Sequence, residues 1–129
     1  MKAKTKNILL TKTEIKLMNI LWDIKQATVN ELIRSLPEPK PPYTTVLTVM
    51  QVLTRKQVVT FKKQGRAYTY IPLLSYQEYL NNYMNEICGN LFQGSIKSFF
   101  LFFIKHENIS RKEIEEAFEL SDEQIDPKQ

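Results

Sequence analysis

The chain has 129 residues, of which 43% are hydrophobic and 25% are charged. This composition fits one compact domain or two small lobes and excludes disorder over most of the length. The single cysteine, Cys88, excludes an internal disulfide and indicates a reducing compartment. The longest apolar run, residues 99–104, is well short of the roughly 20 residues that a membrane span needs. The sequence therefore predicts a cytoplasmic protein without membrane insertion.

Charge divides the chain in two. Residues 1–72 carry thirteen Lys or Arg and four Asp or Glu residues, a net charge of +9, whereas residues 73–129 carry a net charge of −5. Such asymmetry is typical of a nucleic-acid-binding module joined to a separate oligomerisation or regulatory part. A solvated surface with unevenly placed lysines would give the same count.

Two helices are predicted before residue 37. Thr11 with Glu14, and Thr28 with Glu31, have the spacing of a capping box. Apolar residues recur at helical spacing after each cap, and they are Ile15, Met18, Leu21 and Trp22, then Val29, Leu32, Ile33 and Leu36. The pattern predicts helices over about residues 12–25 and 28–36, and the prolines of residues 37–42 end the second helix.

The third predicted helix runs from residue 43 or 44 to residue 56, with Val46, Val49, Met50 and Leu53 as its buried stripe. Its polar residues, Thr44, Thr45, Thr48, Gln51 and, further along, Arg55, fall largely on the other side. This face is short and weakly charged. It is either an ordinary exposed face or a surface that fits closely against another molecule.

A β-hairpin follows. Residues 58–61 and 67–71 are of β type, and they flank a basic, glycine-containing tip with Lys62, Lys63, Gly65 and Arg66. Three helices followed by a basic-tipped hairpin describe a winged helix-turn-helix.

This fold predicts a DNA-binding surface, because the second helix of a helix-turn-helix enters the major groove. The residues expected to contact DNA are Tyr43, Thr44, Thr45, Thr48, Gln51 and Arg55 on the helix and Lys62, Lys63 and Arg66 on the wing. Lys2, Lys4 and Lys6 would add phosphate contacts if the N-terminal arm lies near the duplex. The alternative is a winged helix that serves protein–protein contacts without sequence-specific DNA binding.

The C-terminal segment is predicted to be helical and to dimerise. Capping patterns start at Ser75, Ser110 and Ser121, and residues 90–105 are apolar on nearly every face. An isolated helix of that kind would expose its apolar side chains to water, so either a partner subunit or a membrane must bury them. The segment is short for a span and the helix at 111–120 is acidic, so a homodimer is favoured. Its expected core is Ile96, Phe99, Phe100, Phe103 and Ile104, with Ile114, Ala117 and Phe118 packed on it.

The predicted fold class is therefore mainly α with a small β-hairpin. A winged-helix DNA-binding domain is expected over residues 1–73 and a helical dimerisation domain over residues 74–129. No enzyme, cofactor or metal site is predicted. Cys88 and His106 alone do not make a tetrahedral zinc site, and the glutamates of residues 113–119 are interpreted as a solvated face.

Two stretches resemble the penicillinase repressor family. They are Tyr43-Thr44-Thr45-Val46-Leu47-Thr48 and Gly65-Arg66-Ala67-Tyr68-Thr69-Tyr70-Ile71-Pro72-Leu73, and the first helix, with Glu14 and Trp22, is also similar. The resemblance covers about residues 8–120. It implies a homodimeric transcriptional repressor that acts on a dyad-symmetric double-stranded DNA operator. It also implies relief by a signal-dependent step, in several such systems cleavage triggered by a membrane-bound sensor metalloprotease.

The chain departs from the family pattern at four places. Gln57 stands where the family often has the glycine that closes the recognition helix, and Val52 where many members have arginine. Phe102-Phe103 matches the Asn-Phe pair at which some members are cut. The C-terminal cysteines of the copper-responsive members are missing, which excludes copper sensing by that route.

Overall fold

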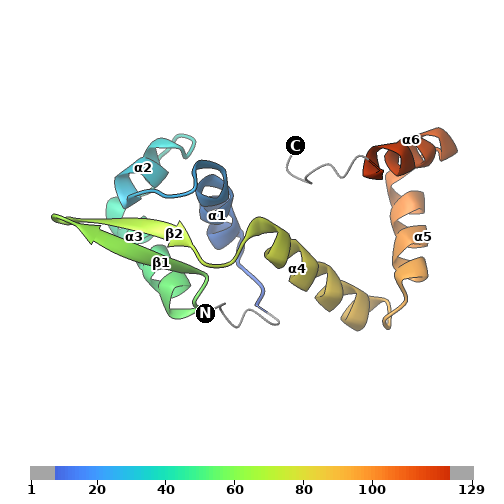
Figure 1. Ribbon diagram of the computed structural model, residues 1–129, viewed down its shortest axis with the longest axis horizontal. Helices are drawn as coiled ribbons and strands as arrows, with labels where there is room; N and C mark the ends of the chain where they lie inside the picture. Colours follow the sequence, from blue (N-terminus) through green and yellow to red (C-terminus); the bar gives the residue numbers. More distant parts are fainter. Residues whose placement is uncertain (1–7, 123–129) are drawn as a thin grey trace. The chain divides into compact units, whose positions relative to one another are not determined.

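The computed structural model describes residues 8–122. Its elements, in order, are α1 (Lys12–Ile24), α2 (Val29–Arg34), α3 (Tyr43–Arg55), β1 (Val59–Gln64), β2 (Ala67–Pro72), α4 (Tyr76–Leu91), α5 (Ile96–Glu107) and α6 (Arg111–Ser121) (Figure 1). The chain forms two compact units, Met1–Tyr83 and Met84–Gln129, and α4 passes from one to the other. The predicted fold class, mainly α with a small hairpin, is confirmed.

The capping patterns start the helices as predicted. At Thr11, Thr28 and Ser110 the hydroxyl accepts from the backbone N–H three residues later, and the glutamate there accepts from the N–H of the cap. Ser75 and Glu78 make the same two bonds, at 3.0 and 2.9 Å. Ser121 differs, because it is the last residue of α6 and donates to the carbonyl of Phe118. Its expected partner, Gln124, lies outside the described residues.

One hydrophobic core holds the first unit together. Met18, Leu21, Leu32, Met50 and Leu53 are fully buried where α1, α2 and α3 meet. The start of α4 is fixed to this core by aromatic side chains. The Trp22 indole N–H donates to the carbonyl of Leu74 at 2.8 Å, and the Trp22 ring lies 5.3 Å from that of Tyr76 and 5.9 Å from that of Tyr79.

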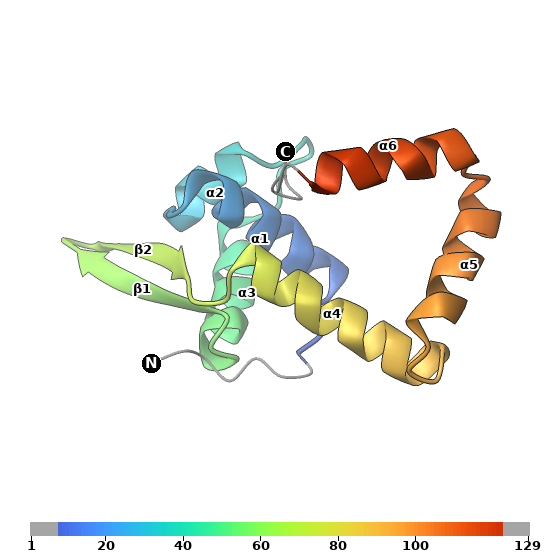
Figure 2. The ribbon, with the colours of Figure 1, turned by 45° about the vertical axis from the view of Figure 1, so that its right-hand side comes forward.

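The hairpin projects beyond the three helices (Figure 2). Its strands are antiparallel, from the pair Val59↔Pro72 to the pair Gln64↔Ala67, and Gly65 turns the chain with φ +64°. The strands are longer than predicted. Lys62 and Lys63 therefore lie within β1 on opposite faces of the sheet, not in the loop at its tip. Cross-strand pairing as far as Gln64 leaves only Gly65 and Arg66 to make the turn.

Ala27 adds a third backbone to the sheet, which the sequence pattern did not predict. It exchanges two hydrogen bonds with Tyr70, at 3.1 and 2.7 Å. This bridge ties the residue just before α2 to β2, so the helix-turn-helix and the wing are joined by backbone bonds as well as by side-chain packing.

The end of α3 has a left-handed closure at Gln57, the position where the sequence departs from the family's glycine. Gln57 has φ +64°. Its N–H donates to the carbonyl of Thr54, and the N–H of Val58 donates to that of Leu53, both at 3.0 Å. These two bonds form a Schellman motif, in which glycine is the preferred residue because it has no Cβ to clash.

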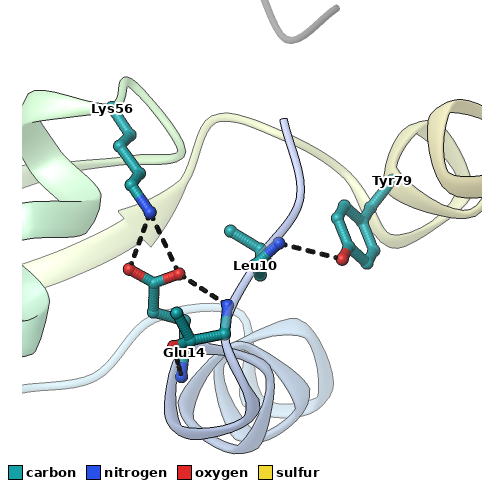
Figure 3. Close-up of polar contacts among 5 residues, drawn as sticks. Leu10, Glu14, Lys56 and Tyr79 are labelled. Atoms are coloured by element: carbon teal, nitrogen blue, oxygen red, sulfur yellow. Dashed lines mark hydrogen bonds and ion pairs between the residues drawn. The ribbon is translucent and has the colours of Figure 1, made fainter. Parts of the chain in front are cut away.

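A partly buried ion pair also holds the end of α3 (Figure 3). The Lys56 ammonium lies 3.0 and 3.1 Å from the two carboxylate oxygens of Glu14, which is only 5% exposed. The same carboxylate accepts from the N–H of Thr11 at 2.9 Å. Next to it, the N–H of Leu10 donates to the Tyr79 hydroxyl at 3.1 Å. The N-terminus of α1 therefore fixes both α3 and α4.

The second unit has little core of its own. Residues 90 and 91 belong to α4, and α5 begins only at Ile96, because Gln93 and Gly94 adopt positive φ and Ser95 caps the new helix. Within α5 and α6 no residue is buried. In residues 8–122 no single helix has the length and apolar composition of a membrane span. Only α4 and α5 together have them, with a bend of 95° between them.

Gln57→Gly is expected to raise the free energy of unfolding by about 1 kcal/mol, because a non-glycine residue is strained at this φ. Denaturant unfolding of the wild type and the variant measures the difference. Gln57→Ala is the matched control, since it shortens the side chain without relieving the strain. Equal stabilities of the glycine and alanine variants would contradict the closure described here.

Glu14→Gln and Lys56→Met are each expected to lower the free energy of unfolding by about 1–2 kcal/mol, since each leaves its partner without an opposite charge. Glutamine keeps an oxygen for the Thr11 N–H, which isolates the loss of the ion pair. In a double-mutant cycle, the coupling energy should be about 1 kcal/mol. Strictly additive losses would show that the pair does not hold α3.

Candidate nucleic-acid interface

The outer face of α3 is polar and exposed. Thr44, Thr48, Gln51 and Arg55 follow one another at steps of four, three and four residues, so they share one side of the helix, and all four are exposed. Val46, Met50 and Leu53 on the opposite side anchor the helix in the core. The structure thus turns this face away from the protein, as the spacing predicted.

The hydroxyl of Thr48 already uses its proton. It donates to the carbonyl of Thr44, one turn back, at 2.8 Å. The oxygen's remaining lone pair and the γ-methyl group are what Thr48 can offer to a ligand. At the start of α3, Pro42 makes no side-chain cap, so no side chain competes for the first-turn N–H groups.

Thr45 lies on another flank of α3. It is exposed, but it lines a separate hollow with Lys16 of α1 and with Pro37, Pro39 and Pro41. The predicted set of helix residues is therefore split, because Thr45 is about 100° around the helix from Thr44.

A hollow of about 450 Å³ separates α3 from the hairpin. Four of the predicted DNA-binding residues line it, namely Tyr43, Gln51, Lys63 and Arg66. The described residues that line it include no Asp or Glu. A neighbouring hollow continues along α3 and is lined by Gln51, Thr54, Arg55 and three aromatic residues of the hairpin. The space beside α3 is thus positively charged.

The wing carries its cations on both faces. Lys62, Lys63 and Arg66 are all exposed, and the Lys63 ammonium lies 6.0 Å from the centre of the Tyr68 ring. Because Lys62 points to the opposite face from Lys63, it does not line the hollow. Lys2, Lys4 and Lys6 lie outside the described residues.

Tyr70 is a member of the site that the sequence did not single out. It is buried in the core and lines the hollow. Burial, followed by the neighbouring Tyr43 and Tyr68, raises the pKa of Tyr70 above its ordinary value. The phenol therefore stays neutral at physiological pH and adds no negative charge to the hollow.

The residues expected at a dimer interface lie on a largely exposed surface of the second unit. Ile96, Phe100 and Phe103 are exposed, and Phe99 and Ile104 are half-buried. Phe100, Phe103 and Ile104 line an apolar hollow of about 420 Å³ together with Ile114, Ala117 and Phe118. Residues of α5 and α6 thus line one hollow, although Ala117 and Phe118 remain exposed.

The Phe102-Phe103 pair lies in the middle of α5, with both side chains exposed. His106 stacks on Phe102 with ring centres 5.5 Å apart, and its Nδ1 lies 2.9 Å from the Glu107 carboxylate. Among residues 8–122, no three His, Cys, Asp or Glu side chains gather into a possible metal site.

Three helices, a paired hairpin and a positively charged space between them define a winged-helix DNA-binding protein. The chain belongs to the penicillinase repressor family, a family of transcriptional repressors, whose model matches residues 10–123.

Relatives and a solved structure agree with this assignment. The penicillinase repressor of Bacillus licheniformis is 24% identical over 115 residues, which are 85% of this chain and 87% of that protein. The methicillin resistance regulatory protein MecI of Staphylococcus aureus is 26% identical over 108 residues, with 83% and 88% covered. The solution structure of the DNA-binding domain of the repressor BlaI superposes with a TM-score of 0.50 at 24% identity. It covers 60% of this chain and 93% of that domain, and it supports the fold.

Proposed function

We propose that this chain is a homodimeric transcriptional repressor that binds a dyad-symmetric operator. The observation that carries the proposal is the exposed polar face of α3 beside a hairpin, with a shared hollow that is lined by cations and, among residues 8–122, by no acidic residue. Residues 1–73 form the DNA-binding domain and residues 74–129 the dimerisation domain in this proposal. The printed names of the relatives, repressors of penicillinase and a regulator of methicillin resistance, support it.

In the proposed complex, α3 lies in the major groove. Thr44, Thr48 and Gln51 meet base edges, and Tyr43, Thr45 and Arg55 approach the flanking backbone. Because the Thr48 proton is used within the helix, its oxygen accepts from an amino group of adenine or cytosine, and its methyl group can pack on a thymine methyl. These are the contacts that supply sequence preference.

The wing supplies affinity without sequence preference. Lys62, Lys63 and Arg66 neutralise phosphates, and each neutralised phosphate releases counterions. Since Lys62 and Lys63 lie on opposite faces of β1, they contact phosphates on either side of the hairpin.

Dimerisation covers the apolar surface of the second unit. Ile96 and Phe118 are 66% and 65% exposed, and α5 and α6 contain no buried residue. A surface of this kind calls for a partner, and a second copy supplies an identical apolar surface. A two-fold axis between the copies then presents two α3 helices to half-sites about one turn of DNA, or a small multiple, apart.

Repression ends, in this proposal, through a signal-dependent step, and a membrane-bound sensor metalloprotease is the proposed partner. The Phe102-Phe103 bond lies within the hydrogen-bonded backbone of α5, so cleavage there requires local unwinding of that helix. Transient opening of α5 would therefore set the rate of any cut at this pair.

Thr48→Ala is expected to reduce discrimination between the DNA upstream of the chain's own gene and a random duplex of equal length. Lys63→Ala is expected to weaken binding to both alike and to lower the slope of log K against log salt by about one. Gel shifts over a salt series measure both effects. Equal losses on the two duplexes for both variants would contradict the placement of α3. If the wild type binds duplex DNA no more tightly than heparin and shows no sequence preference, a protein–protein interaction module would be favoured.

Phe103→Ser is expected to raise the dimer dissociation constant by about two orders of magnitude or more, because two copies of a buried phenyl ring are lost per dimer. Phe102→Ser is the matched control, since Phe102 is also exposed on α5 but does not line the hollow with α6. Sedimentation equilibrium measures the constants. A monomeric wild type, or equal effects of the two variants, would contradict this interface.

A further inference from the structure

An aromatic pair lies exposed on the hairpin, and neither the core nor the DNA contacts proposed above use it. Phe61 and Tyr68 are 42% and 41% exposed, with ring centres 4.8 Å apart. The core does not need them, because Val59 and Tyr70 on the same face of the hairpin already fill it. Two large rings left half in water indicate a surface that contacts something.

The pair faces α3. Along β1, Val59, Phe61 and Lys63 share one face of the sheet, and Tyr70 and Tyr68 lie opposite the last two. Phe61 and Tyr68 line the hollow that runs along Arg55, and Tyr68 also lines the one that contains Lys63 and Arg66. The rings thus form the hairpin side of a channel whose other side is α3.

The charge of the lining residues indicates which kind of ligand the channel can bind. Arg55 from α3 and Lys63 and Arg66 from the hairpin line it, and no Asp or Glu is among the described residues that do so. An occupant must therefore combine negative charge with apolar surface for the rings. The backbone of DNA does so, because phosphates alternate with deoxyribose rings whose C–H faces are apolar.

We propose that Phe61 and Tyr68 seat one sugar–phosphate strand of the duplex, packing against its deoxyribose rings while the cations bind the adjacent phosphates. This inference rests on the proposed function, since a strand lies beside any helix that enters the major groove. In this proposal the Tyr68 hydroxyl donates to a phosphate oxygen. These contacts of Phe61 and Tyr68 contribute affinity and fix the position of the protein along the duplex, but they do not distinguish between base sequences.

The experiment measures the affinity of the full chain for the upstream DNA and for a random duplex of equal length. Phe61→Ala and Tyr68→Ala are each expected to weaken binding to both duplexes by about tenfold. The slope of log K against log salt should stay unchanged, because a ring releases no counterions, whereas Lys63→Ala should lower it by about one. Leu73→Ala is the matched control, because Leu73 is 41% exposed but lines neither hollow.

Photo-crosslinking gives a readout that loss of hairpin stability cannot imitate. With p-benzoylphenylalanine in place of Tyr68, the chain should crosslink to either duplex, and with the same group in place of Leu73 it should not. Suppose that the wild type binds DNA, the alanine variants bind it with unchanged affinity, and position 68 gives no crosslink. This result would overturn this inference alone. A wild type that ignores both duplexes would overturn the proposed function, and this inference with it.

Discussion

The geometry of the DNA-binding unit depends on how the last turn of α3 is held. Three bonds meet there: the hydrogen bonds from Gln57 to Thr54 and from Val58 to Leu53, which together form the Schellman motif, and the ion pair from Lys56 to Glu14. Glu14 also caps α1. One carboxylate therefore fixes where α1 begins and where α3 ends, and the chain that leaves α3 enters the hairpin within four residues. The distance between α3 and the wing follows from this junction.

That distance sets what the surface can bind. Backbone bonds between Ala27 and Tyr70 hold the sheet from the other side, so the channel between α3 and the hairpin is framed at both edges. Preformed spacing lets a rigid duplex bind without ordering the protein first, which lowers the entropic cost of association. The polar face of α3 carries one cation, Arg55, whereas the wing carries three, Lys62, Lys63 and Arg66.

Local sequence patterns predicted the helices, but they did not predict the contacts between residues far apart in the sequence. Capping residues and apolar spacing placed α1 and α2 to within a few residues, and apolar spacing alone placed α3, because both signals act inside one helix. The strands were predicted too short, since cross-strand pairing rather than local alternation carries β1 to Gln64. Glu14 was expected only as a cap. Its bond to Lys56 spans 42 positions, and no periodicity encodes such a contact. Phe61 and Tyr68 were predicted only as ordinary strand residues, because local alternation does not encode their contact across the hairpin.

The division of charge, +9 over residues 1–72 and −5 over residues 73–129, agrees with separate tasks for the two halves of the proposed repressor. In the proposed complex, a single DNA-binding unit offers one short helix face to one half-site, and its affinity falls with salt. In the proposed dimer, the second unit binds at an effective concentration set by the tether, which multiplies affinity without any new contact to DNA. The exposed surface of α5 and α6 is largely apolar, so in the proposed dimer substitutions there alter dimerisation and leave the DNA contacts of α3 unchanged. In the proposed repressor, regulation through the C-terminal half controls operator occupancy while the recognition surface on α3 stays constant.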